Sequence, residues 1–135
     1  MKKTLILSSA LMALATAASA QTLTVMSWGG AYSESQVEAY NKPFAAMKGI
    51  TVNMVDSDNP ATPIKAMVEA GNVSVDVADV ELSDAVRLCD EGLIEEIDPA
   101  ILPAGADGTP ATDDFIEGSL TDCAVASIVW STIYA

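Results

Sequence analysis

Aromatic rings, paired glycines and carboxylates follow the apolar runs of this sequence, and they are the residues best suited to bind a small molecule. Trp28 and Tyr32 flank Gly29-Gly30-Ala31 after a first apolar run, Asp58 follows a second run, and Glu81 follows a third. In an open parallel sheet, ligands bind beyond the carboxyl ends of the strands, so we expect these side chains on one rim. Rings and carboxylates together suit an amine, through cation–π contact and charge pairing.

Other roles stay open for the same residues. The glycines before a helix could leave N–H groups free at Gly30, and these would instead hold an anion such as the carboxylate of an amino acid. Trp28 could equally close the end of the core, because large aromatic side chains are usually mostly buried. Trp130, on a later apolar run, could add a second ring to the site or pack in the core together with Tyr134.

Composition excludes several classes of function. The chain has 135 residues, no histidine and a formal net charge of −13. Without histidine, these residues contain neither a Ser-His-Asp nor a Cys-His site and no histidine-ligated zinc. Six cationic residues against 19 acidic ones argue against a nucleic-acid partner, since phosphate binding needs clustered lysine and arginine. We therefore expect no catalytic residues, no metal and no cofactor.

The first twenty residues predict a signal peptide. Lys2 and Lys3 precede an uncharged, mostly apolar run over 5–17, and Ala18-Ser19-Ala20 supplies the small-x-small pattern for cleavage. The run is too short to cross a bilayer comfortably. We expect export to the periplasm with cleavage after Ala20. The part that follows carries four cationic residues against 19 acidic ones, a net charge of −15.

Cys89 and Cys123 both lie in the exported part of the chain. An even pair of cysteines in an oxidising compartment predicts a disulfide. On the chain-entropy model, closing this loop would stabilise the fold by roughly 3–4 kcal/mol.

Alternating strand and helix signals predict an α/β fold with a mostly parallel sheet and right-handed crossovers. Ser33 is expected to begin the first helix, Pro43 to kink or divide it and Gly49 to end it; Ser83 is expected to cap the last helix. Residues 103–114 are expected to form a surface loop. The predicted strands are 23–27, 50–55, 75–80 and 127–134, and the predicted helices are 33–48, 64–70 and 83–91.

Four stretches together resemble a known family. They are Leu-Thr-Val-Met-Ser-Trp-Gly-Gly-Ala-Tyr (23–32), Val-Asp-Val-Ala-Asp-Val-Glu (75–81), Cys-Asp-Glu-Gly-Leu-Ile-Glu-Glu-Ile-Asp (89–98) and Thr-Asp-Cys-Ala-Val-Ala-Ser-Ile-Val-Trp-Ser-Thr-Ile-Tyr (121–134). The chain is similar to bacterial extracellular, periplasmic solute-binding proteins of ABC transporters, in particular the spermidine/putrescine-binding group.

The resemblance implies a periplasmic-binding-protein-like fold of type II, in which two α/β lobes close on a ligand. Residues 21–135 would be the first lobe, cut short near the hinge crossing at 127–134, and the second lobe would be absent from this chain. Trp28, Tyr32, Glu81 and Trp130 match positions that contact the ligand in polyamine receptors.

We therefore expect a receptor rather than an enzyme, binding a small cationic solute such as a polyamine. Its partner would be an ABC permease in the inner membrane, and we expect a monomer that binds no nucleic acid. The same receptor could instead hold an amino acid or a carboxylate at the helix start after Gly30. A secreted enzyme with catalytic residues beyond Ala135 and a lone lobe without function are the remaining alternatives.

Overall fold

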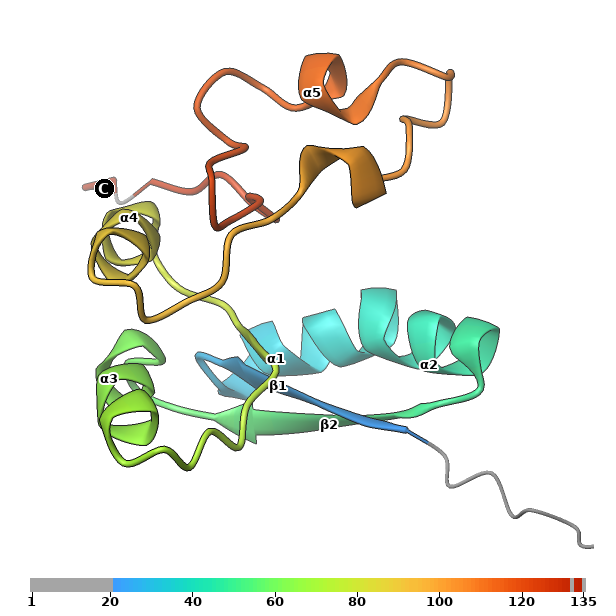
Figure 1. Ribbon diagram of the computed structural model, residues 1–135. Coiled ribbons are helices and arrows are strands. Elements are labelled where there is room, and N and C mark those ends of the chain that lie inside the picture. The colour runs from blue at the N-terminus through green and yellow to red at the C-terminus, as the bar shows by residue number, and fades with distance from the viewer. Residues whose placement is uncertain (1–20, 132, 135) are drawn as a thin grey trace, which may run out of the picture.

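The computed structural model describes residues 21–131, 133 and 134 (Figure 1). The predicted signal peptide, residues 1–20, lies outside the described residues. Strands and helices alternate along the chain. In order they are β1 (Thr22–Ser27), α1 (Gly30–Gln36), the π-helical turn η1 (Val37–Asn41), α2 (Lys42–Lys48), β2 (Thr51–Asp56), α3 (Ala61–Glu69), β3 (Val77–Ala78), α4 (Leu82–Asp90), the 3-10 turn η2 (Pro99–Ile101) and α5 (Ala111–Asp114).

The three strands form one parallel sheet in the order β2-β1-β3, with β1 at its centre. Thr22 pairs with Thr51 and Ser27 with Asp56, so β1 and β2 are in register along their whole length. Only Val77 and Ala78 of the third predicted strand pair with β1, which makes β3 shorter than the expected 75–80. The predicted α/β lobe with a parallel sheet flanked by helices is confirmed.

Helices α1, η1 and α2 form one continuous run beside β1 and β2 (Figure 1). The helix begins at Gly30, and Ser33, the expected cap, lies inside it. Gly29 has a positive φ of 86° that lets the chain turn directly after β1, and the Ser33 hydroxyl oxygen then accepts the Gly29 N–H at 2.9 Å. Ser33 therefore bonds back to the helix start instead of forming it.

The run is not broken at Pro43, but it changes from π-helical to α-helical next to this residue. Proline has no N–H to donate to the preceding turn, and the wider π-helical turn η1 lies immediately before it. The run ends at Gly49, which has the left-handed φ of 66° common at helix ends, so the predicted stop is confirmed.

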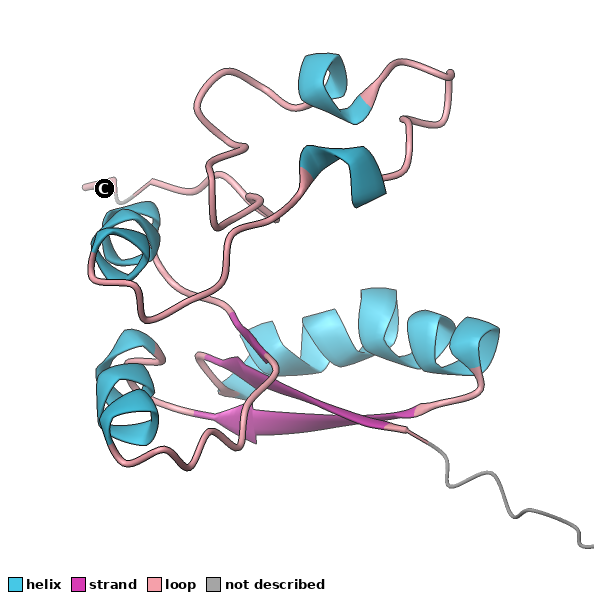
Figure 2. Cartoon of the chain, in the orientation of Figure 1, coloured by secondary structure: helices cyan, strands magenta, loops and turns pink. Residues whose placement is uncertain are grey.

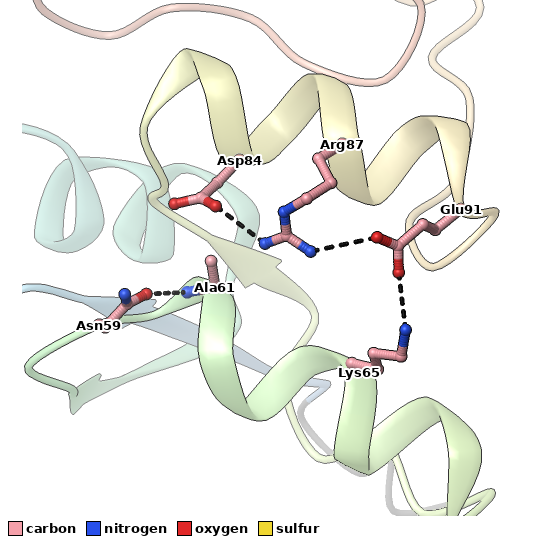
Figure 3. A network of polar contacts seen from close by, with 6 residues as sticks. All are labelled: Asn59, Ala61, Lys65, Asp84, Arg87 and Glu91. Atoms are coloured by element: carbon pink, nitrogen blue, oxygen red, sulfur yellow. Dashed lines mark hydrogen bonds and ion pairs between the residues drawn. The ribbon is translucent and has the colours of Figure 1, made fainter.

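Helices α3 and α4 lie side by side (Figure 1). They pack around Leu88, whose side chain is 0% exposed. Polar contacts join the same two helices on their surface (Figure 3). Arg87 pairs with Asp84 and Glu91 along α4, and Glu91 also pairs with Lys65 of α3 at 2.9 Å.

The predicted cap of α4 is wrong by two residues. Ser83 lies inside the helix, because the Ala85 N–H donates to the Glu81 carbonyl at 2.9 Å and so places the helix start at Leu82. The extended backbone of Glu81 already has the conformation of a residue preceding a helix, and no side-chain bond is needed to begin it.

Residues 93–131 are mostly loop and lie above the sheet in the view of Figure 2. Within the loop expected at 103–114, the short helix α5 forms because Asp113 and Asp114 donate their N–H groups to the Pro110 carbonyl. The expected disulfide is confirmed: Cys89 of α4 is bonded to Cys123, with 5.9 Å between their Cα atoms.

The fourth predicted strand, Ser127–Tyr134, is wrong over 127–131, 133 and 134, none of which is in a strand. A strand exists only through pairing of its backbone groups, and the sheet described here ends at β3. Its side chains are exposed, Trp130 by 61% and Tyr134 completely, so the expectation that these two rings pack in the core is also wrong.

Candidate ligand-binding cavity

A cavity of about 950 Å³ lies between the sheet, helix α1 and the segment 116–130. Leu23 and Val25 of β1 contribute its apolar floor. Because side chains alternate along a strand, Met26 turns to the other side, where it is buried. The volume lies at the upper end of the range of ordinary small-molecule sites.

Four of the six residues expected to bind ligand line this cavity. Trp28 and Tyr32 enter it from the region after β1, Glu81 from the start of α4, and Trp130 from the C-terminal segment. The carboxyl ends of β1 and β3 therefore do bring rings and a carboxylate together. Gly30 and Asp58 are exposed and are not among the residues lining the cavity.

A polar cluster at the rim was not predicted from the sequence. Asp79, directly after β3, accepts three hydrogen bonds on one carboxylate oxygen, Oδ2. The donors are the Tyr32 hydroxyl at 2.7 Å, the Gln36 amide at 2.6 Å and the Ser27 hydroxyl at 3.3 Å. The signal that could have found it is an acid at the end of an apolar strand, since Asp is seldom buried without partners.

This cluster makes ionisation of Tyr32 less favourable. Partial burial, together with the hydrogen bond and the negative charge of Asp79, raises the pKa of Tyr32 to about 12. The hydroxyl of Ser127 partly opposes that shift in the pKa. Tyr32 therefore stays neutral at physiological pH and keeps its proton on the side of Asp79.

The start of α1 has a defined geometry of its own. Gly29 and Gly30 both have positive φ values, 86° and 57°. A Cβ at Gly30 would meet no atom within 4 Å, whereas one at Gly29 would approach the side chain of Asp56 to 3.3 Å. The N–H groups of the first helical turn have no acceptor within the helix, so they are available to a ligand or to water.

Within residues 21–131, 133 and 134, no group of three or more acidic or cysteine side chains is placed to hold a metal ion. No helix in the same part of the chain is both long and apolar enough to cross a membrane.

A parallel α/β lobe with a large, ring-lined cavity at the carboxyl ends of its strands is the arrangement of a ligand-binding protein. The family model described as bacterial extracellular solute-binding protein matches residues 39–134. The chain belongs to this family. Members of the family bind solutes, which confirms the expectation of a binding protein rather than an enzyme.

A named relative is also a solute-binding protein. A gamma-aminobutyric acid-binding protein from Pseudomonas aeruginosa is 42% identical over 123 residues, which are 91% of this chain and 33% of that protein. The chain therefore spans about a third of the length of the curated relative that it matches.

Two solved structures are similar to this lobe. The binding protein MotA from A. tumefaciens, in complex with glucopine, has a TM-score of 0.65 and 29% identity over 76% of this chain and 29% of that one. An ABC transporter substrate-binding protein from Bradyrhizobium japonicum has a TM-score of 0.57 and 34% identity over 58% and 24% of the two chains. Neither of these structures nor the curated relative is named for a polyamine.

Proposed function

We propose that this chain is part of the solute-binding component of an ABC importer, which delivers a small solute to a permease in the inner membrane. The family supports a solute-binding role, and the similar chain from Bradyrhizobium japonicum is named as an ABC transporter substrate-binding protein. Residues 1–20 would be the signal peptide, removed after Ala20 in the periplasm.

Residues 21–135 would form the first of two lobes. The observation that carries this proposal is the cavity, whose lining includes large apolar side chains that are exposed in this chain, among them Leu82, Ile128 and Trp130. Soluble monomers rarely expose a contiguous apolar surface of this kind unless a ligand or another domain covers it. A second lobe would cover it when the protein closes on its solute, and the receptor would act as a monomer.

The solute best supported is a small amino acid or other carboxylate. The curated relative is named for gamma-aminobutyric acid, which carries an ammonium group and a carboxylate. Trp28, Tyr32 and Trp130 would contact the solute through their rings. The first-turn N–H groups of α1, at Gly30, would face its carboxylate.

A polyamine is the second candidate. It is favoured by the carboxylates of Glu81 and Asp79 beside the rings of Trp28 and Tyr32, because ammonium groups bind to both kinds of side chain. For such a solute, Glu81 would pair with one ammonium group and Asp79 with another.

Closure would follow from differential affinity. A solute that contacts both lobes binds the closed form more tightly than the open form, and this difference shifts the population of the hinge. In that mechanism this lobe supplies the preformed half of the site.

The test uses the complete protein and a panel containing 4-aminobutyrate, amino acids, dicarboxylates, putrescine and spermidine. We expect one of these to bind stoichiometrically in isothermal titration calorimetry and to raise the melting temperature, with no chemical change in the solute. Binding of none of the panel, or turnover of a bound compound, would contradict the proposal. Binding of putrescine or spermidine alone would select the second candidate.

A further inference from the structure

We propose that Asp79 and Tyr32 form the subsite for a protonated amino group of the solute. Asp79 would contact it through Oδ1 and Tyr32 through its hydroxyl oxygen. This inference deepens the proposed function and rests on it, because it names a chemical group that the cavity recognises. Neither the resemblance of the sequence nor the named relatives assign a role to Asp79.

The two carboxylate oxygens of Asp79 differ in their hydrogen-bond partners. Ser27, Tyr32 and Gln36 all donate to Oδ2, at 2.6–3.3 Å. No hydrogen bond to Oδ1 is found among the described residues, and Asp79 is half-buried in the cavity lining. One oxygen therefore anchors the carboxylate, and the other is left to accept from a ligand.

The hydroxyl of Tyr32 is a hydrogen-bond donor toward Asp79. A phenol has a single proton, and Tyr32 donates it to Asp79 at 2.7 Å. The hydroxyl oxygen, on which the Ser127 hydroxyl also acts, can then offer only a lone pair to a molecule in the cavity. Tyr32 and Asp79 together present acceptors and a negative charge, which suit an ammonium group and repel a carboxylate.

The side-chain amide of Gln36 has a partner for its N–H group but none for its oxygen. Its side chain is only 4% exposed, lines the cavity and donates its amide N–H to Asp79. The carbonyl oxygen of the same amide, Oε1, is buried and has no donor in this structure. A buried acceptor without a partner is costly, so the cluster lacks a donor of the kind that an amino group supplies.

Glu81 and Glu117 are the other carboxylates that line the cavity, and both are less suited to anchor the amino group. Both side chains are exposed, and Glu81 caps no backbone group of α4. Ordering a mobile carboxylate on binding costs conformational entropy, whereas Asp79 is already held by three donors. Asp79 is therefore the preorganised carboxylate of the cavity.

The experiment measures binding of three probes to the complete protein by calorimetry: 4-aminobutyrate, n-butylamine and butyrate. We expect 4-aminobutyrate to bind more tightly than butyrate. Y32F and D79N should each weaken 4-aminobutyrate by about 10- to 100-fold, the range for losing a hydrogen bond to a charged group. The matched control is E34Q, which removes one negative charge from an exposed position of α1 away from the cavity and should leave the affinity unchanged.

D79N also has a qualitative signature that a general loss of folding would not give. Because Ser27, Tyr32 and Gln36 all donate to Oδ2, they would select the oxygen of an Asn amide at that position, and its N–H group would take the place of Oδ1 and face the cavity as a donor. The affinity for butyrate relative to n-butylamine should therefore rise in D79N. The melting temperatures of D79N and Y32F control for the folding of each variant.

Three results would overturn the inference. They are equal binding of butyrate and 4-aminobutyrate to the wild type, unchanged 4-aminobutyrate binding in both variants, and binding of neither amine probe. All three leave the proposed function standing if another solute of the panel binds. Only the absence of any bound solute would contradict both proposals.

Discussion

Gly29 lies so close to Asp56 that an added Cβ would require the Asp56 side chain to move by a few tenths of an ångström. A Cβ at Gly29 would stand 3.3 Å from both the Cβ and the Cγ of Asp56. Gly29 also combines a φ of 86° with a ψ of −179°, a region of backbone space that is essentially restricted to glycine. The turn that leads from β1 to the cavity therefore depends on this residue.

Gly29→Ala should destabilise the protein by about 1–3 kcal/mol, because it adds backbone strain and a close contact with Asp56. The measurement is the free energy of unfolding in urea. Gly49→Ala is the matched control, since Gly49 has a φ of 66° but nothing within 4 Å of a Cβ. Its cost should be that of a left-handed backbone alone, about 1–2 kcal/mol. A smaller cost at Gly29 than at Gly49 would show that Asp56 moves away freely.

Reducing the Cys89–Cys123 disulfide should lower the free energy of unfolding by roughly 3–4 kcal/mol, because the open loop has more conformational entropy when unfolded. Denaturation with and without dithiothreitol measures the difference. The double variant Cys89→Ser, Cys123→Ser should reproduce the reduced protein and should not respond to dithiothreitol. An unchanged midpoint after verified reduction would contradict the expected role of the bond.

Glu91→Gln should lower the melting temperature slightly at pH 7 and low salt. The hydrogen bond and charge of Lys65, with a further contribution from Arg87, lower the pKa of Glu91 below its ordinary value. A carboxyl whose pKa is lowered by folding contributes stability above its unfolded pKa, and that stability disappears as the pH falls through the folded pKa.

The difference between wild type and Glu91→Gln should therefore vanish in acid and shrink with added salt, since exposed ion pairs are screened. Glu95→Gln serves as the control, because Glu95 is exposed and takes no part in the ion pairs between α3 and α4. Melting curves from pH 7 down to pH 3 make the comparison. A difference that persists at the acidic end would point to packing instead of charge.

Tyr32 should ionise later than an ordinary tyrosine. Its pKa is raised to about 12, so its contribution to stability is fully present below pH 10 and is lost as the pH rises through 12. The titration of phenolate absorbance should show a component near pH 12 that is absent from Tyr32→Phe. In Asp79→Asn the same component should shift toward pH 10, because the negative charge is removed. A single transition near pH 10 in the wild type would refute the contact.

Local signals predicted the elements whose partners are close in sequence. The paired runs 23–27 and 50–55 form β1 and β2, and Pro43 and Gly49 mark real changes in the helix between them. The serine signals placed both helix starts too late. Gly29, with its positive φ, turns the chain into α1 before Ser33, and the extended backbone of Glu81 precedes α4 before Ser83.

Features that depend on distant partners could not be predicted in the same way. The composition of 127–134 is that of a strand, yet strand formation requires a neighbour to pair with, and sequence pattern does not provide one. Trp28, Tyr32 and Glu81 line one cavity because they follow the ends of β1 and β3, which the sequence pattern predicts, whereas Trp130 lines it from a segment that is not a strand. Asp79 was missed because its three donors lie 43 to 52 residues away, and no local pattern reports such a contact.

The position of β1 at the centre of the sheet has a consequence for folding kinetics. The first strand to be synthesised must wait for β2 and then β3 before both of its edges are paired, and Val25 meets its β3 partner only at Val77. Parallel pairing across such sequence distances raises contact order and slows folding. The helices can form early, but the closing of the sheet, and with it the rim of the cavity, awaits the arrival of β3 beside β1.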